Sequence, residues 1–88
     1  MEWKSNVSVT KGDSYVIADG THEKKASKED EYIIAAMEKG ICDDEKLLQV
    51  IMEQEQYTEM IARLRLAEFV VEYGDYIAPI QRHMKIEM

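Results

Sequence analysis

The feature that most constrains this chain is residues 44–73, a run of 30 residues without glycine or proline. One continuous helix over this run would be about 45 Å long, at ~1.5 Å per residue. A compact domain of this chain's length is only about 30 Å across. An unbroken helix would therefore extend beyond the domain. Either the chain breaks within this run, or a second molecule covers the overhang.

The spacing of apolar residues favours a break. At about 100° per residue, the apolar residues before position 53 point roughly 120° away from those after position 56. The first set is Leu47, Leu48, Val50 and Ile51, and the second is Tyr57, Met60, Ile61, Leu64 and Val71. The sequence therefore predicts two helices, 44–54 and 57–73, separated by a bend or break over 53–56.

An earlier helix is predicted over residues 28–39. Ser27 and Asp30 have the Ser-x-x-acid spacing in which a side-chain oxygen caps the start of a helix. Gly40 provides the left-handed conformation that commonly ends a helix. Asp43 then stands where a cap for the helix over 44–54 is expected.

The N-terminal residues 2–18 predict a β-hairpin. Apolar and polar residues alternate in its first half, and a β-branched and aromatic run forms its second half. A two-residue turn at Gly12-Asp13 pairs Val9 with Val16 and Val7 with Ala18. A three-residue loop instead pairs Val9 with Tyr15 and Val7 with Ile17. We favour the first register. A polar connector over 19–27 then leads to the helices.

Together these elements predict one α+β domain, in which an N-terminal β-hairpin packs against two or three α-helices, the last one long. A chain of this length buries only about 60–65% of its unfolded surface, which leaves little for a second core. Residues 75–88 are expected to form a C-terminal tail or a short helix, since Pro79 permits a helix to start near it.

The helix over 57–73 is apolar on two nearly opposite sides. One stripe runs through Met60, Ile61, Leu64 and Val71, and the other consists of Leu66, Phe69, Val70 and Tyr73. One core cannot cover both stripes, and fully burying such a side chain contributes about 1.5–3 kcal/mol relative to leaving it exposed. We predict that the second stripe is the interface of a homodimer. The alternative is that the C-terminal tail folds back over it.

The charge of the chain bears on its partners and its surroundings. It carries 18 acidic and 11 basic residues, a net charge of −7. Nucleic acid is bound by basic side chains that neutralise phosphates, so this charge disfavours a nucleic-acid partner. A single cysteine excludes an intrachain disulfide and points to the cytoplasm. Neither a membrane-spanning apolar run nor a signal-peptide pattern is recognisable.

No residue pattern indicates catalysis. His22, Cys42 and His83 do not have the close spacing of metal ligands, so we expect no metal site. The glycines lie in short turns rather than in a phosphate-binding loop, so we expect no cofactor. Carboxylate pairs at helical spacing are ordinary surface features in so acidic a chain. We therefore expect a protein that is not an enzyme.

The favoured function is that of a protein-interaction module. Acidic residues at helix starts and on exposed faces would bind a basic protein, possibly one that itself binds nucleic acid, and the chain would act as an inhibitor or regulator. The residues of this predicted acidic surface are Glu29, Asp30, Glu31, Asp43, Asp44, Glu45, Glu53, Glu55 and Glu59. Small acidic chains occur among phage-encoded and accessory bacterial inhibitors, an analogy of size and charge alone.

The alternative function is that of a DNA-binding regulator. The helices over 28–39 and 44–54 have the connectivity of a helix-turn-helix unit, whose second helix enters the major groove. That helix opens with Asp43, Asp44 and Glu45. Bringing these carboxylates to a phosphate backbone is electrostatically unfavourable, so we favour the interaction module.

Overall fold

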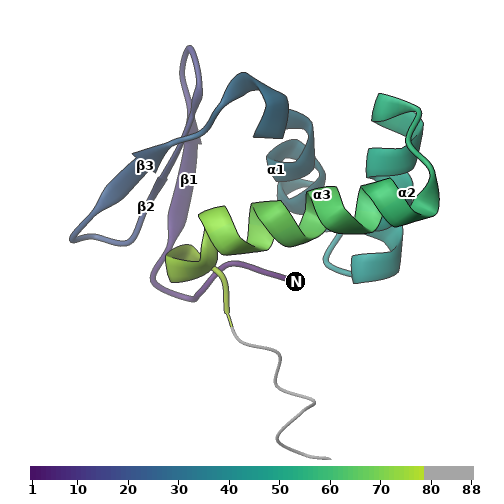
Figure 1. Ribbon diagram of the computed structural model, residues 1–88. Coiled ribbons are helices and arrows are strands. Elements are labelled where there is room, and N and C mark those ends of the chain that lie inside the picture. The colour runs from purple at the N-terminus through teal and green to yellow at the C-terminus, as the bar shows by residue number, and fades with distance from the viewer. Residues whose placement is uncertain (79–88) are drawn as a thin grey trace, which may run out of the picture.

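A computed structural model describes residues 1–78, and residues 79–88 lie outside the described part. The chain begins with a three-stranded antiparallel sheet and continues with three helices, which lie to one side of that sheet (Figure 1). The predicted α+β class with an N-terminal hairpin is therefore confirmed. Most of the predicted C-terminal tail, including Pro79, falls outside the described residues. No helix in the described range is long and apolar enough to cross a membrane.

The sheet has the order β1-β2-β3, with strands Ser8–Lys11, Tyr15–Ala18 and Glu23–Lys25. The register between β1 and β2 differs from both predicted registers, because Val9 pairs with Ile17. Three residues, 12–14, join the two strands, which is the loop length of the alternative that was not favoured, but each residue of β1 pairs two positions further along β2 than that alternative predicts. As a result, Val9 and the fully buried Ile17 share one face of the sheet.

Strand β3 falls inside the residues that were predicted to be a polar connector. All three of its residues are charged, which is typical of a loop but also of an edge strand that avoids pairing with other molecules. The Asp19 side chain accepts hydrogen bonds from the Thr21 and His22 amides at 2.9 and 2.7 Å. These bonds shape the turn between β2 and β3, and they hold the pKa of Asp19 below its ordinary value.

The first helical segment begins with a 3-10 turn, Lys28–Asp30, and continues as α1, Glu31–Glu38. The predicted cap is wrong in detail, because the Ser27 side chain makes no capping bond. Instead, the backbone oxygen of Ser27 accepts from the Asp30 amide at 3.0 Å. Gly40 has the expected left-handed conformation, with φ of 97°, and ends this segment as predicted.

Helices α2, Asp44–Glu55, and α3, Glu59–Glu72, replace the single long helix that the sequence permits locally. Asp43 caps α2 as predicted, because its side chain accepts from the Glu45 and Lys46 amides at 2.7 and 3.3 Å. The helix breaks over residues 56–58, which meets the predicted range 53–56 only at its last residue. Gln56 adopts a left-handed conformation with φ of 61°, and the Thr58 side chain caps α3. The last helix has only 14 residues, so it is of ordinary length rather than long.

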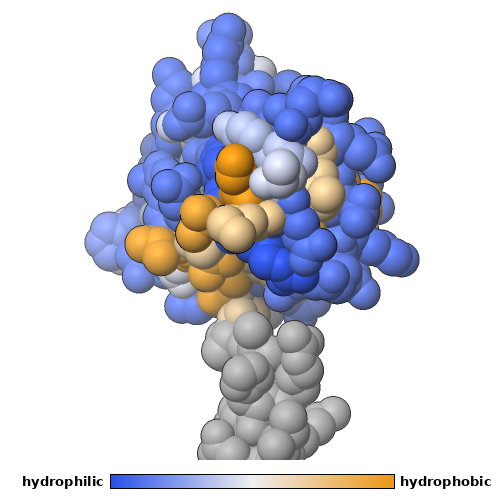
Figure 2. Space-filling view, turned by 45° about the vertical axis from the view of Figure 1, so that its right-hand side comes forward, coloured by the Kyte–Doolittle hydropathy of each residue, from blue (hydrophilic) through white to orange (hydrophobic). Residues whose placement is uncertain are grey.

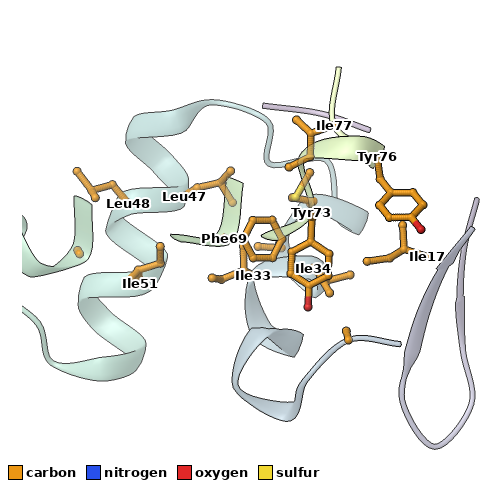
Figure 3. Close-up of a cluster of buried hydrophobic side chains, with 14 residues drawn as sticks. Ile17, Ile33, Ile34, Leu47, Leu48, Ile51, Phe69, Tyr73, Tyr76 and Ile77 are labelled. Carbon is orange, nitrogen blue, oxygen red and sulfur yellow. The ribbon is translucent and has the colours of Figure 1, made fainter. Parts of the chain in front are cut away.

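The core lies between the sheet and the three helices (Figure 3). Phe69 and Tyr73 of α3 point towards the buried residues of α1, with Leu47 of α2 and Ile17 of β2 on either side. The centroids of the Phe69 and Tyr73 rings lie 4.6 Å apart. This aromatic pair fills the centre of the domain, where large rings bury the most apolar surface.

The segment before β1 does not belong to the hairpin. Trp3 forms an isolated antiparallel bridge with Ile77, which follows a 3-10 turn at Gly74–Tyr76. The Lys4 amide donates to the Tyr76 carbonyl and the Ala78 amide donates to the Glu2 carbonyl, both at 2.9 Å. The two ends of the described chain are therefore joined by backbone hydrogen bonds.

Candidate functional site

The outer face of α3 carries most of the exposed large apolar side chains. Val71 is 82% exposed, Met60 is 73% exposed and Leu64 is 61% exposed, with Ile61 and Val70 beside them. These residues point away from the core because they lie on the opposite side of the helix from Ala62, Phe69 and Tyr73. Figure 2 shows an apolar patch within a largely hydrophilic surface. Patches of this kind commonly mark interaction sites.

The two apolar sides of α3 were predicted, but their assignment to core and surface is reversed. Phe69 and Tyr73, which were predicted to form a dimer interface, have no exposed surface and belong to the chain's own core. Leu66 is partly buried against that core, and Val70 is 39% exposed. Tyr73 and Phe69 are the two largest fully buried side chains of the described residues, so the aromatic stripe supplies the centre of the core.

A groove of about 790 Å³ runs between the start of α2 and the side of α3. Its apolar lining comes from Leu48, Leu66, Ala67, Val70 and Val71, and its charged lining from Asp43, Asp44, Glu45, Arg63 and the N-terminal amine of Met1. A second hollow of about 490 Å³ adjoins it, because Leu66, Val70 and Asp44 line both. An apolar floor therefore lies beside a mainly acidic rim.

The rim acids are held by local contacts. Asp43 caps α2, and Asp44 accepts from the N-terminal amine at 3.0 Å. Arg63 of α3 joins Glu45 to Glu59, with nitrogen–oxygen distances of 3.6 and 2.8 Å. The hydrogen bond to Glu59 and the charges of Glu45 and Glu59 raise the pKa of the Arg63 guanidinium. The structure thus brings Asp43, Asp44, Glu45 and Glu59 into one region.

The other predicted acidic residues do not all lie on the surface. Asp30 is only 1% exposed, so its placement on a partner-binding surface was wrong. Glu31 and Glu55 are partly buried, whereas Glu29 and Glu53 are exposed. Burial of the phenol and, after it, the nearby charge of Glu55 raise the pKa of Tyr32.

Asp30 is the centre of a buried polar cluster that the sequence did not reveal. Its carboxylate accepts hydrogen bonds from the Arg65 guanidinium and, at 2.7 Å, from the Tyr73 hydroxyl. Burial and the bond to Asp30 raise the pKa of Tyr73. The available signal was the spacing of Arg65, Phe69 and Tyr73 at four-residue intervals, which places the arginine on the core side of α3. The cluster joins the start of α1 to α3.

Residues with metal-binding or nucleophilic chemistry do not converge in the described structure. Within residues 1–78, no group of three or more His, Cys, Asp or Glu side chains is placed to hold a metal ion. Cys42 is exposed at the edge of the groove, and His22 lies in the turn before β3. Comparison of the chain with protein-family models, curated proteins and solved structures found no match.

Proposed function

We propose that this protein is a non-enzymatic interaction module that binds a basic protein partner at the groove between α2 and α3. The observation that carries the proposal is the combination at that groove of an apolar floor, including Leu66 and Val70, with an acidic rim at the start of α2. The net charge of −7 also favours a basic partner, because it attracts such partners over longer distances.

The chemistry of the groove defines the partner it suits. Apolar side chains at one-turn spacing on a partner helix would pack on Leu66 and Val70, as in other helix-in-groove complexes. Lysine or arginine side chains flanking those anchors would pair with Asp43 and Glu45 at the rim. If those basic residues normally contact nucleic acid, occupying them makes this chain an inhibitor or regulator. A reducing compartment such as the cytoplasm suits its exposed Cys42.

The alternative of a DNA-binding regulator has weaker support. Helix α2 begins with Asp44 and Glu45 after the Asp43 cap, so its N-terminal turn would repel phosphates. The outer face of α3 offers Leu64 and Val71, which are not groups that contact a phosphate backbone. Retention of the protein on DNA at low salt would favour this alternative.

We also propose that the protein is a homodimer. The proposed dimer face is the exposed stripe of α3, which consists of Met60, Ile61, Leu64, Val70 and Val71. It replaces the predicted stripe that contains Phe69 and Tyr73. The exposed fractions of its five large apolar residues are together equivalent to about three fully exposed side chains, and covering them would contribute about 4–9 kcal/mol.

The test of partner binding uses a synthetic helical peptide of leucine and lysine as the probe. Glu45 is exposed at the rim, and Glu45→Lys is expected to weaken peptide binding about tenfold, measured by fluorescence anisotropy at low salt. Glu23→Lys makes the same charge change on the exposed edge strand β3 and serves as the matched control. If both variants lose the same peptide affinity, the loss comes from the overall charge of the protein, and the groove is not the binding site.

A second measurement separates the two functions. The protein is applied to heparin and to immobilised mixed-sequence DNA at low salt, and its retention is followed as the salt concentration rises. An acidic interaction module is expected to pass through both columns. Tight, salt-sensitive retention on DNA would replace the interaction module with the DNA-binding alternative.

A further inference from the structure

The exposed stripe of α3 has the spacing of a coiled-coil seam. Met60, Leu64, Ala67 and Val71 follow one another at intervals of four, three and four residues. This is the alternation of d and a positions over two heptads, with Leu64 and Val71 at a. The residues that face the chain's own core, such as Phe69 and Tyr73, fall at the remaining positions, so all four seam residues are exposed in the described part of the chain, residues 1–78.

The residues that flank the seam carry opposite charges. Arg63 precedes an a position and is therefore a g residue, and Glu68 follows a d position and is an e residue. They are five residues apart, which is the separation at which g and e side chains of two parallel helices meet. Both are exposed, and within the described residues Glu68 makes no ion pair. Arg63 pairs only at the surface, with Glu59 and Glu45.

We propose that a second copy of this chain binds the outer face of α3 with its own α3 running parallel, through the seam of Met60, Leu64, Ala67 and Val71. A two-fold axis along the helix pair makes the contact self-complementary. Arg63 of each copy then faces Glu68 of the other, which gives two equivalent ion pairs. In an antiparallel pair, Arg63 would face Val70 and Glu68 would face Ile61, so neither charge would be matched.

The size of the seam sets the strength of the dimer. The exposed apolar surface of the stripe is on the order of 300 Å², whereas a standard stable interface buries about 800 Å² per partner. We therefore expect a dimer that dissociates in the micromolar range. The small Ala67 side chain allows the two helices to approach closely at the middle of the seam.

This dimer goes beyond the proposed partner binding, because the seam and the groove are different surfaces. The groove opens from the side of α3 towards α2, where Glu45 lies, whereas the seam points directly away from the core. The two surfaces share Arg63, Ala67 and Val71 at their border. Glu45→Lys tests the groove and Leu64→Asp tests the seam, so either proposal can fail while the other holds.

Sedimentation velocity of the full chain from about 1 µM to 1 mM tests the dimer. The wild type is expected to pass from monomer to dimer within this range. Leu64→Asp should weaken association by more than about tenfold, because it places two carboxylates in the seam. Gln49→Asp adds the same charge on an exposed position of α2 and should leave association unchanged. A wild-type chain that is still monomeric at about 1 mM overturns the proposal.

Charge exchange and cross-linking test the parallel arrangement. Arg63→Glu and Glu68→Arg should each weaken the dimer, and the double variant should recover association relative to either single variant. Met60→Cys in a Cys42→Ser background should oxidise to a disulfide-linked dimer, because the two positions meet only in the parallel pair. In the antiparallel pair they lie about 16 Å apart, too far for a disulfide. A dimer with neither recovery nor cross-linking rejects the parallel seam.

Discussion

Replacing Arg65 by methionine tests how the buried carboxylate of Asp30 is stabilised. Asp30 is 1% exposed and accepts from Arg65 and Tyr73. Methionine keeps an apolar stem on α3 but leaves the carboxylate without its cation. Removing one partner of a buried ion pair costs about 3–5 kcal/mol. A domain of this length is stable by only about 4–13 kcal/mol, so this loss is a large share of the whole stability.

Urea unfolding at neutral pH measures this loss, followed by far-UV circular dichroism and by the fluorescence of Trp3. The Trp3 ring lies 6.4 Å from that of Phe69 between centroids, so its emission reports the packing of the core. Arg63→Met is the matched control on the same helix. Arg63 pairs with Glu59 at the surface, and losing that pair should cost less than about 1 kcal/mol.

A triple variant shows whether desolvation is the cause. Arg65→Met, Asp30→Leu and Tyr73→Phe together replace every member of the cluster with an apolar group. No charge or hydroxyl of this cluster then lacks a partner, so stability should return to within about 2 kcal/mol of the wild type. Desolvation of the Asp30 carboxylate is not the cause if Arg65→Met costs no more than Arg63→Met, or if the triple variant is less stable than Arg65→Met alone.

Three further outcomes are expected. Burial and the bond to Asp30 raise the pKa of Tyr73, so the folded state keeps a proton that the unfolded state releases, and Tm should fall as pH rises above about 10. Tyr73→Phe should flatten that decline, and an unchanged alkaline slope would contradict the assignment. Gln56→Gly should raise stability by about 0.5–1 kcal/mol in urea, because Gln56 has φ of 61°; a lower midpoint counts against this. Asp43→Ala should cost about 1 kcal/mol by removing the cap of α2, and circular dichroism melting that matches the wild type would show that the cap is not needed.

Local signals predicted the helical part of the fold well. The change in apolar phase over 53–56 placed a break close to the one between α2 and α3, and Gly40 and Asp43 marked the end of α1 and the start of α2. Each of these signals acts within one or two turns of the chain. The two-sided character of α3 was also visible from spacing alone.

Signals that depend on distant residues were missed. Neither apolar side of α3 is preferred locally, and what decides between them is the packing of Phe69 and Tyr73 against α1 and β2. Asp30 has the composition of a surface acid, and its burial depends on Arg65, which lies 35 positions later. Strand β3 is wholly charged, so only its backbone pairing with β2 makes it a strand. These features exist only once the chain has folded.

The bridge between Trp3 and Ile77 has a consequence for how the molecule opens. A residue near one end of the described chain is paired with one near the other, so neither of these ends can detach without breaking the bridge. Amide hydrogens at Lys4 and Ala78, which take part in this pairing, should then exchange with solvent only when the entire domain opens. Frayed ends are usually the first part of a small protein to exchange, but here the pairing makes them a gauge of global cooperativity.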